Sequence, residues 1–192
     1  MPPMTSEARA PSDFSARERI LLTAHDLFYR EGIRATGIDR VIEASQVAKA
    51  TFYRHYPSKN DLITAYLNFR HDNWMQWLRA TLERHLSAGS APLDALLATF
   101  NEWWRHPDFR GCAFINAAVE LPEAVELARR HKEEMTTAFE TLLLHGAGRS
   151  ARARALSLAV DGAIVHAQMG QPLRTVLDAL KQLAEPLLKG KA

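Results

Sequence analysis

The chain has 192 residues, of which 47% are hydrophobic and 24% are charged, and its formal net charge is +2. These values are ordinary for a globular protein and exclude a polybasic chain, so any contact with nucleic acid must depend on local charge. The single cysteine, Cys112, excludes an internal disulfide and a cysteine-rich zinc site.

Residues 1–14 lack the apolar core of a signal peptide. They are expected to form a disordered leader. No apolar run approaches the roughly 18 residues that a membrane span needs. We therefore expect a cytoplasmic protein without a membrane partner.

Helical periodicity between proline and glycine breaks predicts an all-α protein of about nine helices. The first helix is predicted to begin at Ser15, because Ser15 and Glu18 have the spacing of a capping box. Gly32 is expected to end it, since glycine tolerates a positive φ.

The next three helices are short, short and long. The second is predicted to follow Thr36, with Asp39 completing a capping box, and to end near residue 44. The third is predicted over 48–55, about three residues later, and the fourth over 58–86 with Ser58 as its cap. Two short helices joined by a tight turn and braced by a longer one are typical of a helix-turn-helix. Five later helices are expected at 92–105, 112–120, 122–145, 151–169 and 173–188.

The stretch "VAKATFYRHYPSKNDL", residues 47–62, concentrates cations and aromatic rings on and beside the third helix. Lys49 can reach a base edge or a phosphate, and the hydroxyls of Thr51 and Tyr53 can donate to phosphate oxygens. His55 and Lys59 lie where the next helix begins, and its amides also favour anions. The pattern fits a helix in the major groove of DNA. A solvated helix face, with Phe52 in the core, is the alternative.

Residues 36–62, "TGIDRVIEASQVAKATFYRHYPSKNDL", resemble the DNA-binding motif of the tetracycline-repressor (TetR) family of bacterial regulators. The family pattern has a threonine opening the second helix, then Thr-(Leu/Phe)-Tyr-x-(His/Tyr)-Phe and Ser-Lys-x-x-Leu. The chain matches it with "TFYRHY" at 51–56, "SK" at 58–59 and a leucine at 62. The resemblance and the chemistry together give a set of expected DNA contacts: Thr36, Ala48, Lys49, Thr51, Phe52, Tyr53, His55 and Lys59.

The chain departs from the family pattern in the turn before the third helix. Gln46 stands where the family usually has glycine, and Ala48 stands where a serine often caps the helix. We therefore expect some strain at Gln46 and a weaker cap at Ala48, which has no side-chain acceptor.

The resemblance also implies a function and a division of labour. Residues 15–60 would be a DNA-binding domain, and residues 61–192 would bind a small-molecule effector and form a homodimer. Effector binding would release the protein, a repressor, from double-stranded operator DNA. A helical-bundle enzyme or carrier without DNA binding is the alternative, although no nucleophile–base–acid set stands out, and we expect no enzyme.

The last two helices are the candidate dimer interface. Small residues allow close helix approach on the eighth, and leucines and valine line the ninth: Ala155, Leu158, Ala159, Gly162, Ala163 and His166, then Val176, Leu177, Leu180, Leu183 and Leu187. The alternative is that both faces belong to the core of one subunit.

The effector pocket is expected among large apolar groups and a few polar residues on the middle and late helices: Trp74, Trp77, Trp103, Phe114, Asn116, Phe139 and His166. Most of them could equally be core. Cys112, near a helix N-terminus and Arg110, is a possible sensor or a small buried residue. The basic run at 129–132 is interpreted as a solvated face. We expect no cofactor and no metal site, since no histidines stand at metal-ligand spacing.

Overall fold

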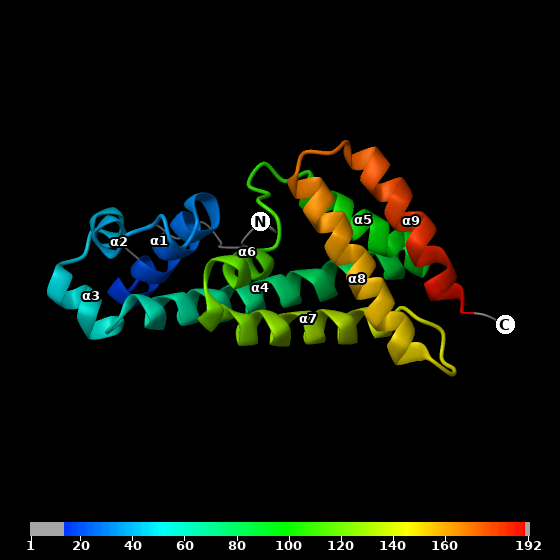
Figure 1. Ribbon diagram of the computed structural model, residues 1–192, viewed down its shortest axis with the longest axis horizontal. Coiled ribbons are helices and arrows are strands. Elements are labelled where there is room, and N and C mark those ends of the chain that lie inside the picture. The colour runs from blue at the N-terminus through cyan, green and yellow to red at the C-terminus, as the bar shows by residue number, and fades with distance from the viewer. Residues whose placement is uncertain (1–13, 191–192) are drawn as a thin grey trace. The chain divides into compact units, whose positions relative to one another are not determined.

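The computed structural model describes residues 14–190, and every regular element within them is a helix (Figure 1). The all-α prediction is confirmed. In chain order the elements are α1 (Ala16–Glu31), α2 (Ile38–Ser45), α3 (Lys49–His55), α4 (Lys59–Ser87), α5 (Pro92–Trp104), α6 (Ala113–Glu120), the 3-10 helix η2 (Pro122–Ala124), α7 (Val125–Glu140), α8 (Arg149–Gln168) and α9 (Leu173–Lys189). The leader predicted at 1–14 lies, but for its last residue, outside the described residues.

The helix predicted over 122–145 is shorter than expected at both ends. Residues 122–124 form η2, and α7 stops at Glu140. The guanidinium of Arg149 donates to the carbonyl oxygen of Glu140 from Nε (3.1 Å) and Nη2 (2.6 Å). A side chain thus satisfies a carbonyl at the helix end that would otherwise lack a partner.

Capping at the helix starts follows the sequence in two cases and not in a third. Ser15 and Glu18 form the predicted capping box, and the Ser58 hydroxyl accepts from the Asp61 amide at 3.1 Å. The box predicted at Thr36 is wrong. Gly37 is the N-cap of α2, without a side-chain bond, and the Thr36 hydroxyl instead donates to the Gly32 carbonyl at 2.8 Å.

The described residues divide into two compact units, which we treat separately. The helix-turn-helix unit comprises residues 14–73 and 113–128. Its core is formed by apolar side chains of α1, α2, α3 and α4, among them Ile20, Phe28, Val41, Phe52, Leu62 and Tyr66. Residues 113–128, which include α6 and η2, join this unit although they are distant from it in sequence.

The C-terminal unit comprises residues 74–112 and 129–190. Within it α8 and α9 lie side by side, and α9 also packs on α5 (Figure 1). The face predicted for dimerisation is divided: Val176 and Leu180 are buried in the subunit, whereas Leu158 and Leu183 are 73% and 57% exposed.

Gln46 is the only described residue other than glycine with a positive φ, 53°, as the C-cap of α2. The strain expected from its place in the turn is confirmed, because the left-handed conformation costs an L-residue roughly 1–2 kcal/mol.

We expect Gln46→Gly to raise the free energy of unfolding by up to about 1 kcal/mol, because relief of the strain exceeds the entropy that glycine adds to the unfolded chain. Urea denaturation would measure it. Gln46→Ala is the matched control, since it keeps a Cβ in the same conformation. A glycine variant no more stable than the alanine variant would contradict the interpretation.

Candidate nucleic-acid interface and effector site

Helix α3 is anchored through its inward face. Phe52 has no exposed surface, and its ring lies 5.3 Å from that of Tyr53 and 6.3 Å from that of Tyr56. Tyr56 is also buried, and its hydroxyl donates to the Arg17 carbonyl of α1 at 3.4 Å. These contacts fix the rotation of α3 about its own axis.

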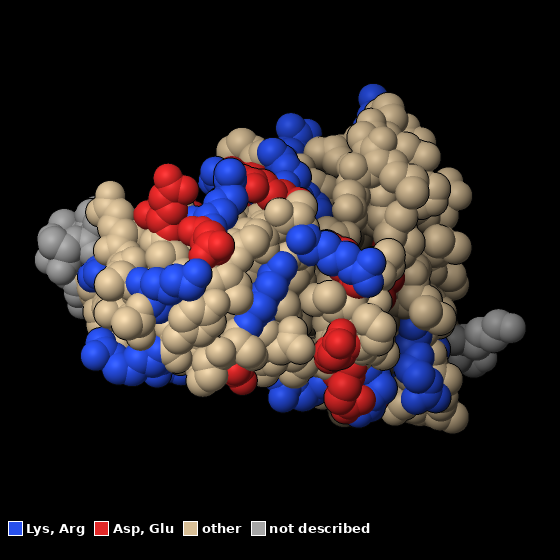
Figure 2. All heavy atoms as spheres, turned by 60° about the vertical axis from the view of Figure 1, so that its left-hand side comes forward, with Lys and Arg blue, Asp and Glu red and all other residues tan. Residues whose placement is uncertain are grey.

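Other side chains on and beside α3 are accessible to solvent. Ala48, Lys49 and Tyr53 are exposed, and Thr51 and His55 are half-buried. Lys49 Nζ lies 3.2 Å from Asp39 Oδ1 of α2, and because both side chains are mostly exposed this ion pair is weak. Figure 2 turns this end of the molecule forward and shows Lys and Arg at many places on the surface. These side chains can therefore offer a cation and hydroxyls to an anionic partner.

Two of the eight expected DNA contacts need correction. The side chains of Thr36 and Phe52 are fully buried. A buried side chain cannot touch a groove or a phosphate, so both residues act through structure. Phe52 orients α3, and Thr36 holds the turn between α1 and α2 through its bond to Gly32.

Lys59, the first residue of α4, faces partly inward. Its Nζ donates to the Ile33 carbonyl at 2.6 Å and lies 6.0 Å from the centre of the Phe28 ring. Burial lowers the pKa of Lys59, and the Glu120 carboxylate opposes that shift. One of the three ammonium donors is thus engaged within the unit.

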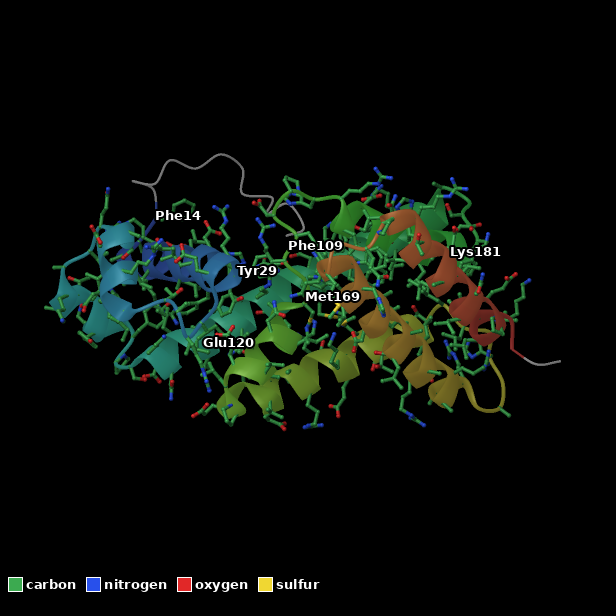
Figure 3. All side chains as sticks on the ribbon, turned by 45° about the horizontal axis from the view of Figure 1, so that its top comes forward. Phe14, Tyr29, Phe109, Glu120, Met169 and Lys181 are labelled. Carbon is green, nitrogen blue, oxygen red and sulfur yellow. The ribbon has the colours of Figure 1, made fainter. Side chains whose placement is uncertain are left out.

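Glu120, at the end of α6, holds the same α1–α2 turn from another element. Its carboxylate accepts from the Arg34 amide at 2.8 Å (Figure 3 marks the residue). Gly32, in the same turn, has a φ of 94°, a backbone conformation that suits glycine. The sequence spacing gives no signal for this contact, because its two residues are 86 positions apart.

Four of the predicted pocket residues come together in the C-terminal unit. The Trp74 ring lies 6.2 Å from Trp77 and 5.5 Å from Trp103, and Phe139 joins them through Phe100 at 6.1 Å. We call these five residues the aromatic cluster. The indole nitrogen of Trp103 is buried without a hydrogen-bond partner.

The other three predicted pocket residues do not join this cluster. Phe114 and Asn116 belong to the helix-turn-helix unit, where the Phe114 ring lies 6.2 Å from that of His71. His166 is exposed on α8. Its place among the lining residues was wrong, because it lies on the outward face of that helix.

A buried polar group in the C-terminal unit was missed from the sequence. Lys132 Nζ donates to Asp161 Oδ1 at 2.6 Å, and only 20% and 24% of these two side chains is exposed. Burial alone would lower the pKa of Lys132, but its interactions with Cys112 and with the Asp161 carboxylate raise it above the usual value. The solvated face expected at 129–132 is therefore wrong for Lys132 and for His131, which is 2% exposed.

Within residues 14–190 no three or more His, Cys, Asp or Glu side chains gather so that they could hold a metal ion. No helix in this range is long and apolar enough to cross a bilayer.

The arrangement defines a class: a helix-turn-helix protein with a cationic, hydroxyl-bearing recognition helix. A sequence model described as "Bacterial regulatory proteins, tetR family" matches residues 20–66. The chain is 31% identical to SCO4454, a TetR-family transcriptional regulator from Streptomyces coelicolor, whose crystal structure superposes with a TM-score of 0.74 over 90% of this chain and 94% of that one.

Two further transcriptional regulators are similar to the chain at lower sequence identity. The HTH-type transcriptional activator FasR of Mycolicibacterium smegmatis is 29% identical over 153 residues, covering 78% of this chain and 68% of FasR. A cysteine mutant of the TetR-family regulator CifR, crystallised with 26-base-pair double-strand operator DNA, shares the fold at 19% identity (TM-score 0.72, 93% of this chain and 98% of that one). The chain belongs to the TetR family: it is a DNA-binding transcriptional regulator and not an enzyme.

Proposed function

We propose that the protein is a homodimeric repressor that a small molecule releases from its operator. The observation that carries the proposal is that α3 buries Phe52 in the core and leaves the side chains of Lys49 and Tyr53 exposed. A helix held in this way can enter a major groove with its exposed face against the DNA.

The DNA contacts have separate roles. Tyr53, Thr51, His55 and Lys59 are assigned to phosphates, and Ala48 allows the backbone to approach. Lys49 is assigned to a base edge, since exchange of its weak pair with Asp39 for DNA costs little. Activation is the second candidate for the regulatory outcome, favoured by the name of the FasR relative. A reporter gene behind the chain's own operator, with and without the regulator, decides between the two.

Tyr53→Phe should weaken operator and non-operator DNA alike, by roughly the 1–3 kcal/mol of a hydrogen bond to a charged group. Lys49→Ala should change the sequence preference more than the non-specific affinity. Fluorescence anisotropy on operator and scrambled duplexes at fixed salt measures both. Gln46→Ala, beside α3 but outside the assigned contacts, is the control. A Tyr53→Phe protein that lost only operator affinity would overturn the phosphate assignment.

The dimer is proposed to form through the exposed apolar faces of α8 and α9. Leu158 and Leu183 are exposed there, and Met169, which caps α8, is 73% exposed. A two-fold axis through such a self-complementary patch would pair α8 and α9 with their copies. Two recognition helices about 34–36 Å apart would then reach successive major grooves.

We expect Leu158→Glu to convert the dimer into a monomer and to weaken operator binding, because it places charges opposite one another across the axis. Light scattering after size-exclusion chromatography measures the mass. Val119→Glu is the matched control: Val119 is 83% exposed on α6, and its charged variant should stay dimeric. Wild-type protein that is monomeric at micromolar concentration would refute the dimer.

The effector is proposed to bind against the aromatic cluster. Rings there supply apolar area, and the unpartnered Trp103 indole N–H can donate to an acceptor on the effector. The effector must bind one arrangement of the dimer better than the other, or it cannot shift the population bound to DNA.

Two roles stay open for Cys112: a sensor of oxidants or electrophiles, and a packed residue before α6. Its 4% exposure favours the packed residue. We expect N-ethylmaleimide to leave operator affinity unchanged in the wild type, as in Cys112→Ser, which has no thiol, and fluorescence anisotropy would measure it. A response present only in the wild type would make Cys112 the sensor.

A further inference from the structure

Ala50 and Arg54 lie on the side of α3 opposite the buried Phe52. An α-helix turns by about 100° per residue, so Arg54 is rotated by about 200° from Phe52, and Ala50 is rotated by the same amount in the other sense. Phe52 has no exposed surface, whereas Ala50 and Arg54 are both exposed. Because they are four residues apart, the two lie one above the other on the line of α3 that points away from the core.

The guanidinium of Arg54 is free to bind an external partner. Within residues 14–190 Arg54 forms no hydrogen bond or ion pair. The other cations of this region are engaged: Lys49 Nζ lies 3.2 Å from Asp39 Oδ1, and Arg40 Nη2 lies 2.6 Å from Glu31 Oε1. Arginine keeps its charge at every ordinary pH and has five N–H donors, so Arg54 offers its full set.

The residues on either side of Arg54 carry hydroxyls. Thr51 and Tyr53 are rotated by about 100° from Phe52 in opposite senses, and both are assigned above to phosphates. In a major groove the phosphates border the groove and the base edges form its floor. A helix whose two flanks meet phosphates turns its central line toward the base edges. The methyl group of Ala50 leaves room for a close approach, and Arg54 is the long side chain on this line.

We infer that Arg54 is a specificity-determining residue that reads a guanine in each half of the operator. In the major groove guanine presents two acceptors, O6 and N7, which match the two-pronged guanidinium. The inference rests on the proposed function, in which α3 enters the groove. It adds a base identity to a set of contacts that are mostly assigned to phosphates.

Two other roles for Arg54 make different predictions. A cation in the last turn of α3 stabilises the helix, because it faces the negative end of the helix dipole. Loss of that role alone would lower stability and leave the sequence preference unchanged. A contact with a phosphate would contribute equally to every DNA sequence, so its loss would weaken operator and non-operator duplexes alike.

The test is selection of bound sequences from a library of randomised duplexes, at one salt concentration, by the full-length wild type and two variants. We expect the wild type to enrich sites with a guanine at one position in each half. Arg54→Met should lose the preference at that position alone. Arg79→Met is the matched control: it removes a 59%-exposed arginine of the C-terminal unit and should keep the wild-type preference.

A second measurement changes the DNA and leaves the protein intact. Replacement of the selected guanine by 7-deazaguanine removes the N7 acceptor and keeps the base pair. Fluorescence anisotropy should show that the wild type binds the modified duplex about fivefold or more weakly, as for a weakened bidentate base contact. Arg54→Met should bind the two duplexes equally.

Three outcomes would overturn the inference and leave the proposed function standing. They are an unchanged sequence preference in Arg54→Met, an equal loss of affinity for selected and scrambled duplexes in that variant, and full wild-type affinity for the 7-deazaguanine duplex. A wild type that enriches no sequence would refute the inference and the proposed function together.

Discussion

Burial of Phe52 is the constraint on which the DNA-binding surface depends. A fully buried phenylalanine contributes about 1.5–3 kcal/mol, and here it also determines which side of a seven-residue helix meets solvent. A helix so short has little stability of its own, so its orientation comes from packing. With Phe52 inside, Lys49 and Tyr53 are left exposed at the rim of this contact. The recognition chemistry is thus a consequence of the core beneath it.

The turn between α1 and α2 connects this core to the rest of the unit. Lys59 binds the Ile33 carbonyl from the start of α4, and Glu120 binds the Arg34 amide from the end of α6. Helix α4 continues past residue 73 into the C-terminal unit. Helix α6 is followed by η2 and then by α7, which enters the C-terminal unit at residue 129. The turn is thus held by side chains from two elements, α4 and α6, that are distant from it in sequence.

Predictions from the spacing of nearby residues were more reliable than predictions that depend on partners far away in the sequence. Ser15 and Glu18 lie three residues apart, so their capping box could be predicted from spacing alone. Thr36 matched the same spacing, but its hydroxyl found a nearer acceptor, the Gly32 carbonyl, which only the folded turn supplies. Lys132 looked solvated within a run of cations, yet its helical register with buried neighbours and its partner 29 residues away place it inside. Phe114 was predicted to line the same pocket as the tryptophans, but it belongs to a different unit, because α6 joins the helix-turn-helix unit.

Two cations show how the fold compensates a charge that is largely removed from water. Lys132, whose side chain is 20% exposed, has the Asp161 carboxylate at 2.6 Å, and its pKa is raised although desolvation alone would lower it. Arg70, 3% exposed, stacks on the Tyr29 ring and contacts His25, whose other ring nitrogen lies 3.1 Å from the Asp26 carboxylate. The bond to His25 and the charge of Arg70 both lower the pKa of Asp26, so the carboxylate responds to the guanidinium. A cation–π contact replaces only part of the hydration that a guanidinium loses, and a carboxylate reached through His25 offsets more of it within the helix-turn-helix unit.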